Sequence, residues 1–109
     1  MPIAYLTLSD KSKTVSEKLV EEWAGYADVS AGLMTVNIVH SDIQLGKAYE
    51  VMAVLHLPSV WSRAKVSRIQ QGLSQSLASH LDLDEKEIHI VTHIVESGLV
   101  VENGAEVHW

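Results

Sequence analysis

Ile3-Ala4-Tyr5-Leu6-Thr7-Leu8 is the stretch that decides the fold, because a similar stretch, Met52-Ala53-Val54-Leu55-His56-Leu57, occurs 49 positions later. The first stretch is apolar on both faces, which predicts a buried strand. A second pair of β-branched stretches, Val36–Val39 and Ile88–Val91, recurs 52 positions apart. The chain is therefore predicted to use one structural unit twice.

Each unit is expected to carry an amphipathic helix between its two strands. Thr14-Val15-Ser16-Glu17 has the pattern of a capping box, which predicts a helix from Thr14 to near Asp28. Trp23 lies on the apolar stripe of this helix and is expected in the core. In the second unit the apolar residues recur at spacings of three and four, which predicts another helix: Val66, Ile69, Leu73, Leu77 and Leu81.

The predicted fold is an α/β tandem βαβ repeat in one domain, residues 1–109, with units at about 2–50 and 51–109. Each βαβ connection implies two parallel strands, and together they predict a four-stranded sheet with both helices on one face. Asn103-Gly104 between short apolar runs predicts a short C-terminal hairpin. The face of the sheet without helices is apolar enough to need covering, and self-association would cover it.

Composition excludes several classes of function. The chain has 109 residues, a net charge of −6 and no cysteine. The acidic balance argues against nucleic acid and anionic membranes as partners, and no apolar run is long enough to span a bilayer. The lack of cysteine fits a cytoplasmic protein. No cofactor is predicted, and no metal site either, because His89 and His93 are four residues apart on a strand, about 13 Å.

Pro2 is the first candidate catalytic residue. If Met1 is removed, Pro2 carries a secondary amine at the N-terminus. Burial and neighbouring cations can lower the pKa of such an amine towards neutrality, where it can act as a general base. It could then move a proton between the oxygen and the carbon ends of an enol. Val51, the repeat partner of Pro2, is internal, so each chain can hold one such amine.

The start Pro2-Ile3-Ala4-Tyr5-Leu6-Thr7-Leu8 resembles that of the 4-oxalocrotonate tautomerases (4-OT). The doubled βαβ unit resembles macrophage migration inhibitory factor (MIF). Together they suggest the tautomerase superfamily. The last segment, from Ile88-His89-Ile90-Val91 to Val101-Glu102-Asn103-Gly104, is more similar to the cis-3-chloroacrylic acid dehalogenase branch. The resemblance implies a homotrimer whose sheets enclose a central channel.

The resemblance to the dehalogenase branch assigns expectations to three residues. Glu102 falls where the branch keeps the carboxylate that activates water, and Asn103 belongs to the turn that would present it. Val91 falls where the branch has an assisting tyrosine, and is expected as an apolar wall of the pocket. A solvated acidic residue beside a hairpin turn remains an equal interpretation of Glu102.

A carboxylate substrate also needs a cation, and the resemblance points to three. Lys11 and Lys13 flank Ser12, where related tautomerases carry an arginine on a loop that reaches a neighbouring subunit. Arg63 is the cation nearest to the positions of the branch's substrate-binding arginines. Lysine does not reproduce the bidentate clamp of arginine, so weaker binding is expected. All three residues could equally be exposed surface cations.

The expected function is that of a tautomerase-like enzyme acting on small 2-oxo or enol carboxylic acids, with Pro2 as general base. One alternative is a hydratase or dehalogenase-like addition of water to unsaturated acids through Glu102. Another is a trimeric family member without catalysis. A ferredoxin-like ligand-binding module with a similar repeat is a fourth interpretation. Trp61 and Trp109 are candidates for the wall of a pocket or subunit seam.

Overall fold

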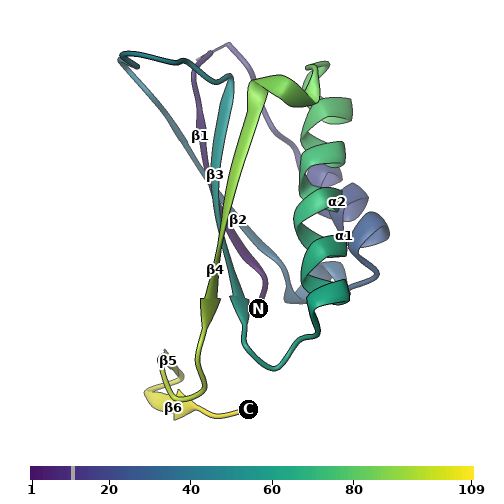
Figure 1. The fold of residues 1–109 in the computed structure, drawn as a ribbon, viewed down its shortest axis with the longest axis vertical. Coiled ribbons are helices and arrows are strands. Elements are labelled where there is room, and N and C mark those ends of the chain that lie inside the picture. The colour runs from purple at the N-terminus through teal and green to yellow at the C-terminus, as the bar shows by residue number, and fades with distance from the viewer. Residues whose placement is uncertain (11) are drawn as a thin grey trace.

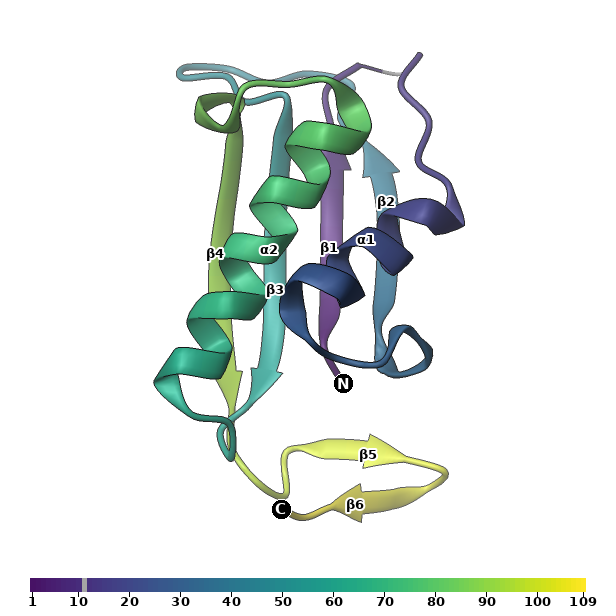
Figure 2. The ribbon, with the colours of Figure 1, turned by 90° about the vertical axis from the view of Figure 1, so that its right-hand side faces the viewer.

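The computed structural model describes residues 1–10 and 12–109, which form a sheet layer and a helix layer (Figure 1). Two helices cover one face of the sheet, and a small hairpin lies beyond one end of it (Figure 2). The sheet order is β2-β1-β3-β4. The elements are β1 (Ile3–Leu8), α1 (Glu17–Ala27), the short 3-10 helix η1 (Ala31–Leu33), β2 (Thr35–His40), β3 (Val51–Pro58), α2 (Arg63–Leu81), the 3-10 helix η2 (Glu85–Glu87), β4 (Ile88–Val95), β5 (Val100–Glu102) and β6 (Ala105–Val107).

The strand pairing confirms the predicted repeat. β1 and β2 are parallel, β3 and β4 are parallel, and the central pair β1 and β3 is antiparallel. The two βαβ halves therefore run in opposite directions through one sheet. As a result, β1 starts at the end of the sheet where β3 and β4 finish.

The first helix begins later than its capping-box pattern predicts. The pattern predicts a start at Thr14, but α1 begins at Glu17 with Ser16 as N-cap, whose hydroxyl accepts a bond from the Lys18 amide. Ser16 is as good a cap as Thr14. It also places Val15 and Val20, both partly buried against the core, at the two positions of a hydrophobic staple. The helix ends as predicted, at a left-handed Asp28.

The core lies between the sheet and the helices, and only one face of each strand contributes to it. Ala4, Leu6 and Leu8 of β1 are buried, but Tyr5 on the other face is 48% exposed. The prediction that β1 is buried on both faces is therefore wrong for the single chain, because helices cover one face only. The open face keeps exposed apolar residues from all four strands, including Tyr5, Val39, Met52, Val54 and Val91.

The two helices pack against each other over the core. Trp23 of α1 is fully buried, as predicted, and its indole N–H donates to the Ile69 carbonyl of α2 at 3.0 Å. At the crossing point α2 carries Gly72, where an added Cβ would lie 2.9 Å from the Cβ of Tyr26. Neither helix in the described part of the chain is long and apolar enough to cross a membrane.

Candidate active site

A cavity of about 280 Å³ lies between the start of β1 and the C-terminal hairpin. Its walls come from both ends of the chain, because β4 runs towards the end of the sheet where β1 begins and delivers the hairpin there (Figure 2). Most of the lining side chains are apolar, and they come from both termini, β1, η1, β2, the end of β3 with the loop after it, and the hairpin. The lining residues are Met1, Ile3, Leu33, Thr35, Pro58, Val60, Val100, Glu102, Val107 and Trp109.

Pro2 lies between Met1 and Ile3, which line this cavity, but it is not itself a lining residue. Its ring is fully buried, and its carbonyl accepts a bond from the Thr35 amide at 3.0 Å, which joins it to the start of β2. Met1 precedes it and lines the cavity. With Met1 attached, the Pro2 nitrogen is an amide without basicity. With Met1 removed, the same nitrogen would be a secondary amine next to the space that Met1 lines.

The hairpin that closes the cavity is fixed by its own geometry and by the last residue. Asn103 and Gly104 both have positive φ, 54° and 74°, as a two-residue hairpin turn requires. This agrees with the hairpin predicted from the sequence. The Trp109 indole N–H donates to the Ser59 hydroxyl at 3.0 Å, and the Trp109 amide donates to the Ser97 hydroxyl at 2.8 Å. Trp109 thus ties the tail to the loop after β3.

The three residues assigned by the resemblance to the dehalogenase branch do not lie together: Glu102 as the carboxylate, Asn103 in its turn and Val91 as a pocket wall. Glu102 is exposed at the end of β5 and lines the cavity. Asn103 lies at the tip of the turn, outside the lining. Val91 lies on the open face of β4, 42% exposed, and does not line this cavity. In a single chain, only Glu102 of these three shares the cavity with Met1.

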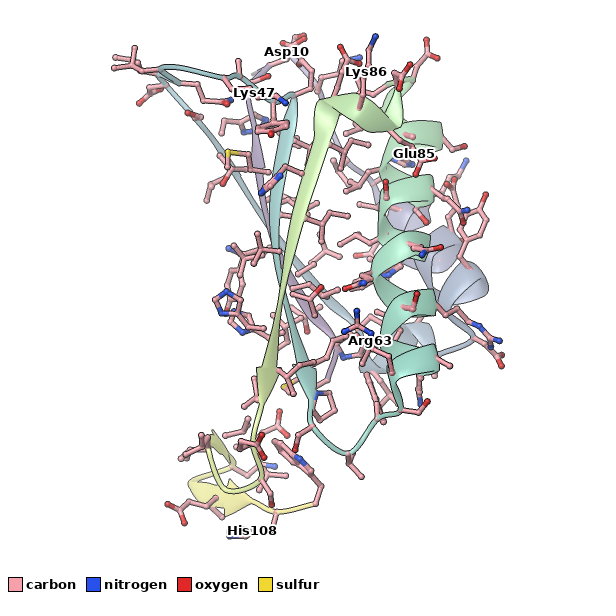
Figure 3. All side chains as sticks on the ribbon, viewed as in Figure 1. Asp10, Lys47, Arg63, Glu85, Lys86 and His108 are labelled. Atoms are coloured by element: carbon pink, nitrogen blue, oxygen red, sulfur yellow. The ribbon has the colours of Figure 1, made fainter. Side chains whose placement is uncertain are left out.

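Two of the predicted substrate-binding cations, Lys13 and Arg63, do not line the cavity. The Lys13 ammonium donates to the Leu81 carbonyl at 3.0 Å, where it caps the C-terminus of α2. That contact lies at the opposite end of the sheet from the hairpin, the end where Figure 3 labels Asp10, Lys47 and Lys86. Arg63 is the first residue of α2, and Figure 3 shows it on the helix side of the sheet. Lys11 lies outside the described residues.

The loop after β1 has a defined local structure around Asp10. The amide and hydroxyl of Ser12 both donate to one Asp10 carboxylate oxygen, at 2.8 Å and 2.6 Å. These hydrogen bonds lower the pKa of Asp10, because they stabilise its charged form. The Lys13 side chain is held by the Leu81 carbonyl rather than presented to solvent. Asp10, Ser12 and Lys13 therefore make their hydrogen bonds within the single chain.

No family model matches the chain, and no curated protein matches it by sequence. Solved structures do resemble it. A wild-type fused 4-OT, an asymmetric trimer, superposes with a TM-score of 0.79 over 95% of this chain and 94% of its own, at 14% identity. The chain has the fold of the tautomerase superfamily.

Two further structures with the tautomerase fold agree. A member of the cis-3-chloroacrylic acid dehalogenase family gives a TM-score of 0.75 at 14% identity, over 96% of this chain and 82% of its own. The macrophage migration inhibitory factor of Oncomelania hupensis gives 0.72 at 17% identity, over 98% and 82%. At such identities the likeness concerns the fold, and the chemistry has to come from the site.

Within this tautomerase fold, the electrostatics of the cavity are unusual for binding an acid. Glu102 is the one charged side chain among the described lining residues. A carboxylate repels a carboxylate, so the cavity of a single chain disfavours an acidic substrate. Apart from the N-terminal amino group, positive charge at this cavity would have to come from a second copy of the chain. The described residues hold no group of three or more histidines, aspartates and glutamates that could bind a metal in its place.

Thr35 and Val60 were missed by sequence reasoning. Thr35 reaches the cavity because β2 pairs with β1 in register, Thr35 opposite Ile3. Val60 reaches it because the chain turns after Pro58 before α2 begins. The parallel pairing of the first unit could have placed Thr35, but nothing in the sequence indicates the course of the short loop.

Proposed function

We propose that the chain is a tautomerase-like enzyme, with Pro2 as general base once Met1 is removed. One observation carries the proposal: Met1 lines a cavity whose lining residues are mostly apolar, and the buried Pro2 comes directly after it. Removal of one residue would place a secondary amine on a fixed ring at the wall of a cavity large enough for a small organic acid. We propose that the protein works as a cytoplasmic homotrimer.

The proposed reaction is a proton transfer between oxygen and carbon. The Pro2 amine takes the proton from the hydroxyl of an enol, and the same proton returns from the ammonium to the substrate carbon, so the product is the 2-oxo acid. Ile3, Val100 and Trp109 give the cavity apolar walls. These walls disfavour the charged form of the amine and limit competition from water.

The substrate carboxylate is proposed to be held by a cation from a neighbouring copy, with Lys11, Lys13 and Arg63 as the candidates. Self-association is supported by the exposed apolar residues on the open face of the sheet and by the trimeric state of the fused 4-OT. Val91 lies on that open face, so in an assembly it could form part of a neighbour's pocket wall.

The test is the Pro2→Ala variant. Both proteins are first checked by intact mass for loss of Met1, and then assayed with phenylenolpyruvate and 2-hydroxymuconate. We expect Pro2→Ala to lower kcat/KM by about 100-fold, the usual contribution of a positioned general base. Val101→Ala is the control, because Val101 lies in the hairpin beside the cavity but is 68% exposed and outside the lining. Unchanged activity of Pro2→Ala would contradict the proposal.

Addition of water to an unsaturated acid is the second candidate function, favoured by the position of Glu102 at the same cavity. In this reaction Glu102 takes a proton from water, the hydroxide attacks one carbon, and a protonated Pro2 donates its proton to the other carbon. Glu102 also favours the protonated amine by its charge. The activity would then fall as pH rises, whereas the tautomerase activity would fall as pH drops.

Glu102→Gln separates the two candidates. For acetylenic or 3-haloacrylic acids, we expect the substitution to abolish any water addition. The matched control is Glu106→Gln, since Glu106 lies on the other strand of the hairpin and outside the lining. Tautomerase activity that survives in Glu102→Gln would favour the first candidate. A processed protein without either activity would favour a trimeric family member that lacks catalysis.

A further inference from the structure

His56 and His93 form a pair on the open face of the sheet. They lie opposite each other in the register of the parallel strands β3 and β4. Their ring centroids are 5.3 Å apart, with the planes at 79°. The third histidine on this face, His89, lies opposite Met52 and stacks on Tyr49 instead, at 4.8 Å. The sheet thus brings together two histidines that are 37 residues apart in sequence.

The ring nitrogens of His56 and His93 make no hydrogen bond or ion pair within the described part of the chain. Three of the other four histidines have polar partners: His40 contacts the Lys13 carbonyl, His80 contacts the Ser16 amide and Glu22, and His108 contacts Glu106. His56 and His93 have ring contacts only, and among the described residues neither has a hydrogen bond or ion pair. Tyr5 meets His56 edge-on at 5.7 Å. His93 is exposed, so its ring can turn about its side-chain torsions.

We propose that His56 and His93 together bind a divalent transition-metal ion such as Zn²⁺ or Ni²⁺. Two imidazole nitrogens at the usual 2.0–2.1 Å from a tetrahedral ion place their ring centres roughly 5 Å apart. The observed separation of 5.3 Å matches this geometry. Neutral imidazole is a preferred ligand of Zn²⁺, Ni²⁺ and Cu²⁺, whereas Mg²⁺ and Ca²⁺ require oxygen ligands.

The site differs from the histidine arrangement that the sequence excluded. His89 and His93 share one strand, whereas the proposed pair spans two strands. The described residues contain no group of three suitable ligands, so the pair supplies two donors and water completes the coordination. Neither histidine lines the cavity beside Pro2. Within one chain, the ion would therefore lie outside the cavity of the proposed proton transfer.

The test is calorimetric titration of the untagged, metal-free full chain with NiCl2 and ZnCl2. We expect one ion per chain. In His56→Asn and in His93→Asn the affinity for the ion should fall by at least about tenfold. His89→Asn is the matched control, because it removes a histidine from the same strand and face; its affinity should stay within about twofold. Circular dichroism checks that each variant is folded.

Histidine NMR gives a second readout on the native chain. The ring signals of His56 and His93 should change together at the lowest ion concentration, before those of His40, His80 and His108. Absence of binding would overturn the proposal. So would binding that survives the double replacement of His56 and His93, or an equal loss of affinity in His89→Asn.

Discussion

The two βαβ halves share one topology but differ in the segment that comes after their second strand. After β2, residues 41–50 form a loop that leads into β3. After β4, the chain forms the hairpin β5–β6 and ends at Trp109, which bonds back to Ser59. Because the halves run in opposite directions, the loop lies at the start of β3 and the hairpin lies at the start of β1.

This difference explains why one repeat yields one candidate site. At the start of β1 stand Met1 and Pro2, and the hairpin closes a cavity over them. At the start of β3 stands Val51, which is buried, inside a continuous chain and without a free amine. The same unit thus serves as a scaffold in one position and as a candidate site in the other. The tail, rather than the repeat itself, makes the difference.

The largest change in stability is expected from a substitution at the contact between the helices of the two halves. Gly72→Ala in α2 should lower the free energy of unfolding by about 1–3 kcal/mol, because the new Cβ would lie 2.9 Å from Tyr26 Cβ of α1. Gly25→Ala in α1 is the matched control, since an added Cβ there meets nothing within 4 Å. It should raise stability by about 0.5–1 kcal/mol through helix propensity.

Urea denaturation of both variants measures these changes. A loss in Gly72→Ala and a gain in Gly25→Ala would establish that the helices cross closely at Gly72 and not at Gly25. Equal gains in the two variants would contradict this packing, because both substitutions would then act through helix propensity alone.

Loss of the hydrogen bond that attaches the hairpin to the loop after β3 should have a smaller effect on stability. Trp109→Phe keeps an aromatic wall but removes the indole N–H that donates to Ser59, a bond worth about 0.5–1.5 kcal/mol. Amide exchange at Gly98, which donates to the Val107 carbonyl, should accelerate by about 2- to 12-fold. Trp61→Phe is the control, because Trp61 is outside the cavity lining and lies under the Lys65 ammonium. Equal exchange rates in the two variants would show that Trp109 does not fix the hairpin.

Much of the fold could be predicted from the sequence, because the spacing of apolar residues indicates each helix and strand and the repeated stretches indicate the two βαβ units. The recurrence of Ile3–Leu8 at Met52–Leu57 indicated two parallel pairs, and Asn103-Gly104 indicated the hairpin. The capping-box pattern predicts a start of α1 three residues before the observed one, since Thr14 and Ser16 are chemically similar caps and the packing of Val15 decides between them. The exposure of Tyr5 was missed because apolar residues on two faces do not reveal which face lacks a cover.

Less of the candidate site could be predicted. Pro2 and Glu102 were placed by resemblance, and the cavity brings Met1 and Glu102 together across almost the whole chain. The resemblance and their charge point to Lys13 and Arg63, but neither gives the direction of a side chain; Lys13 caps α2 instead. The pair of His56 and His93 depends on the register between β3 and β4, which a sequence pattern does not specify.

The most direct test of the central claim compares two forms of the same chain, one with Met1 removed and one with Met1 retained by inhibition of methionine aminopeptidase during expression. Intact mass identifies each form, and circular dichroism confirms that both are folded. With phenylenolpyruvate, the account predicts proton transfer by the processed form and an activity at least about 100-fold lower in the form that keeps Met1. Equal activity of the two forms would contradict the claim that the Pro2 amine is the base.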